Sequence, residues 1–128
     1  MAKEIINMKN ITKRFGGVTA LQNVDLAIND GEIVCLLGEN GSGKSTMIKL
    51  ISGVYRMDEG QAFINGKEYK QITPLESIHE GIAVIYQDFS LFPDLTVAEN
   101  IAISEIVLDG DRLMDWKKAE RIAKTKMD

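Results

Sequence analysis

The sequence predicts an α/β fold, in which an antiparallel sheet accompanies a strand–helix–strand unit. Three features predict this fold class. Residues 23–30 alternate between apolar and polar side chains, as a strand with one buried face does. Residues 33–37 and 82–86 are apolar throughout, which is typical of strands buried on both faces of a parallel sheet. A helical pattern lies between these two runs, and the order strand, helix, strand indicates an α/β chain.

The N-terminal strands are expected to form the antiparallel sheet. Residues 5–11 predict a first strand, and residues 23–30 predict a second one that buries alternate side chains. The glycine pair at 16–17 lies between them and is suited to a turn. A further short strand is bracketed by Gly60 and Gly66, and we expect it to join the same sheet.

Two helices are predicted in the middle of the chain. The first covers about residues 44–52 and is expected to end near Gly53, because glycine commonly follows the last helical residue. The second covers residues 74–79 and begins with a proline, which fits the first turn of a helix.

The C-terminal part predicts two more helices. Thr96 is a candidate N-cap, and Glu99 follows it by three residues, which is the pattern of a capping box. The next helix is expected to begin near Asp111 or Asp115. Its apolar stripe, spaced by three, four and four residues, consists of Trp116, Ala119, Ala123 and Met127. The stripe continues to the last residues without a stop signal, so we expect the chain to be a piece of a longer protein.

Composition indicates a globular domain. The chain has 128 residues, of which 45% are hydrophobic, enough to bury a core. Its formal charge is −4 without blocks of like charge, so nucleic acid is not expected as a partner. The single cysteine, Cys35, lies in an apolar run and is expected to be buried. His79 has no nearby cysteine or histidine to support a zinc site, and no apolar run is long enough to span a bilayer.

The strongest motif is GENGSGKS, residues 38–45, which fits the phosphate-binding pattern G-x-x-x-x-G-K-[ST]. Glycines let the backbone turn tightly with its N–H groups pointing inward, and the following helix points its positive end at the same place. Lys44 can bridge β- and γ-phosphate oxygens, and Ser45 offers a hydroxyl to Mg²⁺. The alternative is a glycine-rich turn that only caps a helix. The apolar run before the motif and the helix after it favour phosphate binding.

Together with three further segments, this motif resembles the ATP-binding-cassette (ABC) ATPases. Residues 11–32 resemble the opening hairpin of that family, residues 54–69 the segment after the first helix, and residues 81–101 the glutamine loop and the entry to the helical subdomain. The resemblance extends over about residues 3–126. The sequences LISGVYRMDEG and AVIYQD are most similar to the first cassette of tandem importers for simple sugars such as ribose, galactose or arabinose.

The resemblance implies a fold and a domain organisation. It implies a P-loop NTPase of the ABC ATPase type, incomplete in this chain. The region of about residues 3–92 corresponds to the β subdomain with the phosphate-loop core, and the region of about 93–128 to the start of the helical subdomain.

The resemblance also implies roles for single residues. Phe15 matches the aromatic residue that stacks on adenine, although a core aromatic beside a turn is the alternative. Gln87 matches the glutamine that contacts Mg²⁺ and the attacking water and couples the site to the membrane domain. Lys44 and Gln87 would act in catalysis, and Ser45 and Gln87 at the metal. The nucleotide would be held by Phe15, Gly38, Glu39, Asn40, Gly41, Ser42, Gly43, Lys44, Ser45 and Thr46.

In the family, two cassettes sandwich ATP head to tail. The resemblance therefore implies an ATPase with ATP and Mg²⁺, a second cassette, membrane permease subunits and, indirectly, a periplasmic or extracellular sugar-binding protein. The protein would lie peripherally on the cytoplasmic face of the cell membrane. The signature LSGGQ and a second apolar strand ending in Asp-Glu do not occur in these residues. We therefore expect this chain alone to bind nucleotide weakly and not to turn it over.

Two alternatives remain open at this point. The first is an ABC ATPase that serves no transporter; the Gln87 segment and the sugar-importer spacing argue against it. The second is a catalytically inert nucleotide-binding or interaction module. The missing acidic residues favour this module, and the last helix, which lacks a stop signal, argues against it.

Overall fold

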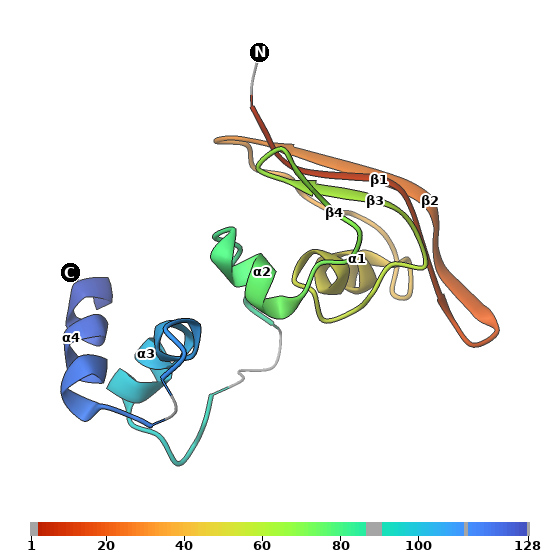
Figure 1. The fold of residues 1–128 in the computed structure, drawn as a ribbon. Coiled ribbons are helices and arrows are strands. Elements are labelled where there is room, and N and C mark those ends of the chain that lie inside the picture. The colour runs from red at the N-terminus through yellow and green to blue at the C-terminus, as the bar shows by residue number, and fades with distance from the viewer. Residues whose placement is uncertain (1–2, 87–90, 112, 128) are drawn as a thin grey trace. The chain divides into compact units, whose positions relative to one another are not determined.

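The computed structural model describes residues 3–86, 91–111 and 113–127. The chain divides into two compact units, Met1–Val84 and Ile85–Asp128 (Figure 1). The first unit contains all strands of the described residues and two helices, and the second contains two further helices. Each unit is described by itself.

The first unit is built on an antiparallel sheet with the strand order β2-β1-β3-β4. Its strands are β1 (Glu4–Phe15), β2 (Val18–Asn29), β3 (Glu59–Ile64) and β4 (Lys67–Tyr69). The strands β1 and β2 form a long hairpin, in which Phe15 pairs with Val18 across the glycine turn (Figure 1). The predicted antiparallel sheet is confirmed, and the short third strand joins it beside β1.

The strand β4 was not predicted, although its turn has a recognisable sequence. Asn65 and Gly66 connect β3 to β4, with φ angles of 51° and 80°. Two successive residues with positive φ characterise the type I′ hairpin turn, and Asn-Gly is its preferred dipeptide. The Asn-Gly pair is therefore the signal that would have revealed the hairpin.

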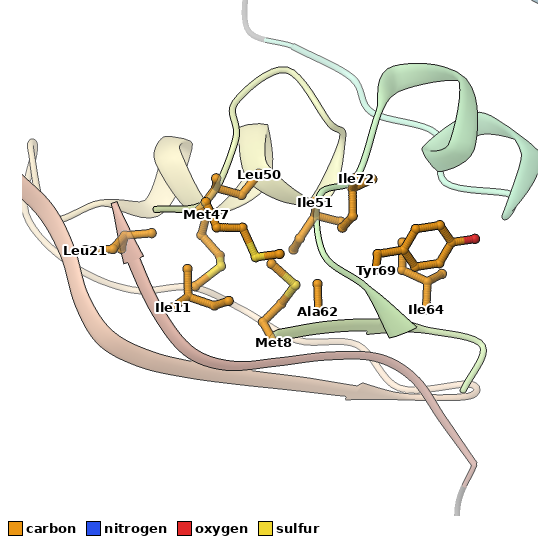
Figure 2. Close-up of a cluster of buried hydrophobic side chains, with 11 residues drawn as sticks. Met8, Ile11, Leu21, Met47, Leu50, Ile51, Ala62, Ile64, Tyr69 and Ile72 are labelled. Atoms are coloured by element: carbon orange, nitrogen blue, oxygen red, sulfur yellow. The ribbon is translucent and has the colours of Figure 1, made fainter. Parts of the chain in front are cut away.

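One face of this sheet packs on α1 (Lys44–Ile51) and forms the main core. Figure 2 shows Met8, Ile11 and Ala62 of the sheet pointing toward Met47 and Leu50 of α1. Other members of the cluster include Leu21, Ile51, Met57, Ile64, Tyr69 and Ile72. Burial of these side chains fixes α1 against the sheet, because removing apolar area from water is the main stabilising term in folding.

The end of α1 is tied to α2 (Pro74–His79). The Ser77 hydroxyl donates to the carbonyl oxygen of Ile51 at 3.2 Å. The backbones approach so closely that a Cβ added at Gly53 would lie 2.4 Å from the carbonyl carbon of Thr73. The predicted bounds of α2 are confirmed, and glycine follows α1 because no larger residue fits there.

The two strands predicted at 33–37 and 82–86 do not form. Both stretches lack regular structure, and Ile33 and Ile85 are 97% and 95% exposed. Cys35 is exposed as well, contrary to the expectation that it is buried. A strand buried on both faces needs neighbours along its edges and cover above and below. Among the described residues every strand pair belongs to the antiparallel sheet, so these two runs have no such neighbours.

The second unit contains α3 (Val97–Leu108) and α4 (Trp116–Met127). The predicted capping box at the start of α3 is confirmed. The Thr96 hydroxyl accepts from the Glu99 N–H at 3.3 Å, and the Glu99 carboxylate accepts from the Thr96 N–H at 2.6 Å. Asp115 precedes α4, and its carboxylate accepts from the N–H groups of Lys117 and Lys118. Of the two starts predicted for the last helix, Asp115 is thus the observed one.

The contact between α3 and α4 buries only the middle of the predicted stripe. Ala119 and Ala123 are buried, whereas Trp116 and Met127 are exposed. The apolar stripe is thus buried only at its two alanines. The described side chains that pack together are Ala102, Ile106, Met114, Ala119 and Ile122. This cluster is small, so it reaches only the central turns of α4.

A charged contact supplements this small cluster. The Lys118 ammonium lies 2.6 Å from the Asp109 carboxylate and 2.7 Å from that of Asp111. These two hydrogen bonds raise the pKa of Lys118 to about 12. Among the described residues, no helix has the length and apolar character that a membrane span requires.

Candidate functional site

The loop before α1 has the backbone geometry of a phosphate cradle. Gly38, Gly41 and Gly43 have φ angles of 155°, 85° and 91°. L side chains rarely adopt such positive φ values, so the bend depends on glycine at these positions. The N–H of Ser42 donates to the Glu39 carbonyl at 3.2 Å, which closes a tight turn inside the loop.

Space as well as φ requires glycine at two of the three positions. A Cβ at Gly43 would lie 2.5 Å from Cδ2 of Leu21 and 2.7 Å from the carbonyl oxygen of Ala20. A Cβ at Gly38 would lie 2.5 Å from the Ser42 hydroxyl oxygen. At Gly41 nothing lies within 4 Å. Gly43 therefore lets the loop approach β2, and Gly38 keeps the inside of the bend open.

The helix α1 presents its N-terminal end at this loop. Gly43 is the N-cap residue, no side chain caps the helix, and the first turn contains no acidic residue. The first amide groups of a helix have no partner within the helix and carry a partial positive charge. Ser45 lies in this first turn and is exposed, and Thr46 beside it is half-buried. This end of the helix is therefore suited to an anion.

The Lys44 side chain is held over the loop by backbone carbonyl groups of the loop itself. Its ammonium group donates to the carbonyl oxygens of Gly38 and Glu39 at 2.6 and 2.7 Å and to the Ser42 hydroxyl at 3.2 Å. A full positive charge thus lies inside the curve formed by the glycines. The predicted role of Lys44 at nucleotide phosphates stays a prediction.

A hollow of about 200 Å³ borders the same loop. Its lining includes Ser42, Gly43 and Lys44 together with apolar side chains of β2 and of the run at 33–37. Phe15, the residue expected to stack on adenine, is not part of this lining. The hollow is thus a space between the loop and β2, distinct from the expected place of the base.

Phe15 lies at the last position of β1 and is 40% exposed. Its ring is paired with that of Tyr55, with ring centroids 5.0 Å apart and planes at 67°. No pattern in the sequence indicates this pair, because forty positions separate the two residues. The alternative of a core aromatic does not describe Phe15, since it belongs to no buried cluster of the first unit.

The other expected site residues are distributed as follows. Glu39 and Asn40 are exposed in the turn of the loop, and the carbonyl oxygen of Glu39 accepts from the Ser42 N–H and the Lys44 ammonium. Gln87 lies outside the described residues. The structure thus places residues 38–46 in the loop and the first turn of α1, and it places Phe15 against Tyr55, which follows that helix.

The donor set fits Mg²⁺ better than a metal held by protein side chains alone. Among the described residues, no group of three or more His, Cys, Asp or Glu could hold a metal ion. Mg²⁺ usually keeps several waters and takes one or two protein ligands beside substrate phosphates. The exposed hydroxyl of Ser45, beside a helix end suited to an anion, is a ligand of that kind.

Comparison with known proteins identifies the family. The sequence matches the family described as ABC transporter over residues 21–128, which is most of the chain. The chain belongs to the ABC transporter family. The resemblance inferred from the loop and its neighbouring segments is therefore confirmed.

Two curated relatives of this ABC transporter chain are ribose import ATP-binding proteins. RbsA of Caldanaerobacter subterraneus subsp. tengcongensis is 42% identical over 117 residues, which cover 91% of this chain and 24% of that protein. RbsA 1 of Streptomyces avermitilis is 51% identical over 100 residues, which cover 78% of this chain and 19% of that protein. The chain thus spans less than a quarter of the length of these relatives.

Solved structures of ABC transporter cassettes are similar in fold. A nucleotide-free ATP-binding cassette has a TM-score of 0.72 and 34% identity over 91% of this chain and 44% of that one. A dimeric cassette in a post-hydrolysis state, bound to ADP and Pi, has a TM-score of 0.73 and 30% identity over 94% of this chain and 54% of that one. These similarities confirm the predicted α/β fold class.

Proposed function

We propose that this chain supplies the ATP-binding loop of an ABC importer subunit that serves uptake of a simple sugar. The relatives described above are ribose import ATP-binding proteins, and one of them is 51% identical. The observation that carries the proposal is the position of the Lys44 ammonium. It lies over the carbonyl oxygens of a loop whose three glycines have positive φ. This arrangement brings one full positive charge and the N-terminal end of α1, which no side chain caps, to a single bend.

The loop would bind the triphosphate of ATP. Backbone amides of Gly41, Gly43 and the first turn of α1 would donate to phosphate oxygens. Lys44 would exchange its two carbonyl acceptors for β- and γ-phosphate oxygens, because charged oxygens accept more strongly than neutral ones. Residues Glu39, Asn40, Ser42 and Thr46 would contribute mainly through their backbone.

The remaining residues would hold the two ends of the nucleotide. Phe15 would stack on adenine, since a flat exposed ring is a platform for a base. The Ser45 hydroxyl and Gln87 would hold Mg²⁺, which neutralises charge on the phosphates when bound. In hydrolysis by the complete protein, Lys44 and Gln87 would stabilise the charge that develops at the γ-phosphate.

The proposal extends to partners and place of action. A second cassette would close on the first, and membrane permease subunits would convert that closure into transport of a sugar delivered by a periplasmic or extracellular binding protein. The complete protein would lie peripherally on the cytoplasmic face of the cell membrane. These assignments rest on the family and on the relatives' names.

The test is calorimetric titration of the complete gene product with ATP and with inorganic tripolyphosphate, without divalent cations so that no turnover occurs. Lys44→Ala should weaken binding of both ligands about 10- to 100-fold, the loss expected for one hydrogen bond to a charged group. Phosphate chemistry is common to both ligands, so both should respond.

The matched control is Lys70→Ala, which removes the same charge from an exposed position after β4. It should leave both affinities unchanged. Equal effects of the two lysine substitutions, or binding of neither ligand to the wild-type protein, would overturn the proposed function.

A further inference from the structure

The aromatic pair of Phe15 and Tyr55 carries an inference that rests on the proposed function. We propose that Tyr55 is a positioning residue, which holds the ring of Phe15 at a fixed place and tilt for stacking on the adenine base. The two rings lie 5.0 Å apart at 67°, in the edge-to-face range that aromatic pairs prefer. Phe15 remains 40% exposed in this pair, so ring surface is still available to a base.

Tyr55 is itself attached to the helix that carries Lys44. Its backbone N–H donates to the carbonyl oxygen of Lys49 at 3.0 Å. The Lys49 ammonium lies 5.2 Å from the centroid of the Tyr55 ring, a cation–π distance. Lys49 belongs to the last turn of α1, and Lys44 to its first. The rigid helix therefore fixes the distance between the phosphate loop and Tyr55.

The end of β1 is held by Asp58, three residues after Tyr55. The Asp58 carboxylate accepts from the Arg14 N–H at 2.6 Å and from the Lys13 ammonium at 3.1 Å. The Asp58 N–H donates to the carbonyl oxygen of Thr12 at 3.0 Å. The hydrogen bond from the Arg14 backbone, followed by that from Lys13, holds the pKa of the Asp58 carboxyl below its ordinary value. Residues 55–58 thus connect α1 to the strand that ends in Phe15.

The same contacts restrict the Phe15 ring. The Lys13 ammonium, held by Asp58, lies 5.2 Å from the centroid of the Phe15 ring, and Tyr55 contacts the ring at an angle. A ring held by two neighbours loses little further freedom when a base stacks on it, and such preorganisation favours binding. Without Tyr55, only the Lys13 ammonium of these two neighbours would remain, and the nucleotide would have to order the Phe15 ring further.

The test compares ligands with and without a base in the complete gene product. Calorimetry gives the dissociation constants of ATP and of inorganic tripolyphosphate, again without divalent cations. The variants are Tyr55→Leu, which removes the ring, Tyr55→Phe, which removes only the hydroxyl, Phe15→Leu, and the double variant Phe15→Leu/Tyr55→Leu.

Tyr55→Leu should weaken ATP binding about 2- to 10-fold, the equivalent of one aromatic pair, and leave tripolyphosphate binding unchanged. Tyr55→Phe should bind both ligands like the wild-type protein, because the ring and not the hydroxyl makes the contact. The double variant should bind ATP no more weakly than Phe15→Leu alone, since Tyr55 acts through Phe15.

Other results would overturn the inference. An unchanged ATP affinity in Tyr55→Leu would remove the positioning role. Equal losses for ATP and tripolyphosphate would give Tyr55 a merely structural role, as would additive losses in the double variant. Binding of neither ligand by the wild-type protein would overturn the proposed function and this inference with it. If Tyr55→Leu bound both tripolyphosphate and ATP as tightly as the wild-type protein does, this inference alone would be overturned.

Discussion

The β1–β2 hairpin and the apolar run at 33–37 follow each other directly in the chain but differ in structure. In the hairpin, two turn residues separate each strand from its partner, and one face is covered by α1 (Figure 2). The run at 33–37 has no strand partner among the described residues, and Ile33 and Leu37 are largely exposed. In these two regions, strand formation therefore follows the availability of a partner strand nearby in the sequence and not the apolar content of the segment.

The comparison extends to the helices. The start of α3 is fixed within four residues by Thr96 and Glu99, and that of α2 by the equivalent pair Thr73 and Glu76. Such structure is determined by neighbours in sequence, because each capping group satisfies an amide within one turn. The apolar run at 82–86, by contrast, needs neighbours that only the wider fold can supply.

The largest difference in stability is expected between leucine-to-alanine substitutions in the core and in the apolar run at 33–37. Leu50 is 1% exposed in the core, and Leu37 is 87% exposed in the apolar run. Leu50→Ala should lower the free energy of unfolding of the first unit by about 2–5 kcal/mol, since it removes buried methyl groups and leaves a cavity. Leu37→Ala should change it by less than about 0.5 kcal/mol.

Urea denaturation of this chain, followed by far-ultraviolet circular dichroism, measures both values. Similar losses for Leu50→Ala and Leu37→Ala would break the comparison, because the run at 33–37 would then be buried as well as the core.

A smaller effect is expected in the phosphate loop, where Gly43 and Gly41 share a positive φ but differ in surroundings. Alanine at Gly43 would collide with Leu21 and Ala20, whereas alanine at Gly41 would meet nothing within 4 Å. Gly43→Ala should therefore be more destabilising than Gly41→Ala by about 1–3 kcal/mol, the usual cost of overpacking. Thermal unfolding of both variants measures the difference, and equal melting temperatures would contradict the packing of the loop on β2.

The capping box of α3 should show a local effect of moderate size. Thr96→Ala removes the acceptor for the Glu99 N–H and should destabilise the second unit by about 0.5–2 kcal/mol. Thr125→Ala is the matched control, because the Thr125 hydroxyl donates to the Arg121 carbonyl oxygen one turn earlier inside α4 and caps no helix start. Fluorescence of Trp116, the only tryptophan, reports unfolding of this unit. An equal effect of both threonine substitutions would contradict the capping role.

The smallest effect is expected from pH. Hydrogen bonds from the Thr96 hydroxyl and then from its backbone lower the pKa of Glu99 below its ordinary value of 4.5. The stabilisation is therefore fully present above the ordinary pKa and is lost as the pH falls through the lowered pKa of the folded state. Glu99→Gln keeps an acceptor but does not titrate, so the Trp116 transition should depend less on pH between about pH 6 and about pH 2.

The control for this titration is Glu120→Gln, at an exposed position of α4. It should retain the pH dependence of the wild-type chain. If Glu120→Gln flattened the curve as much as Glu99→Gln, the dependence would come from total charge and not from the capping box.

Sequence predicted what short-range chemistry determines. Thr96 with Glu99, Pro74 at the start of α2 and the positive φ angles of the loop glycines act within a few residues, so their patterns predict them. The approach of Gly43 to β2 is the part of the loop that depends on distant residues. The hairpin at Asn65 and Gly66 is equally local, because this Asn-Gly pair determines the type of its turn.

Features that depend on distant residues could not be predicted in this way. The contact of Phe15 with Tyr55 joins positions forty residues apart, and no periodic pattern marks it. Trp116 is exposed because α3 covers only part of α4. The spacing of an apolar stripe does not predict how much of a helix its neighbour will cover. The run at 33–37 has the composition of a strand, but its own residues do not determine whether a partner strand is available.

The most direct test of the central claim is a crystal structure of the complete gene product with a non-hydrolysable ATP analogue. The account predicts the β-phosphate within the bend of residues 38–46, with the Lys44 ammonium turned from the carbonyl oxygens of Gly38 and Glu39 to phosphate oxygens. It also predicts the adenine on the ring of Phe15. A triphosphate bound elsewhere, with Lys44 still on its two carbonyl oxygens, would contradict the account.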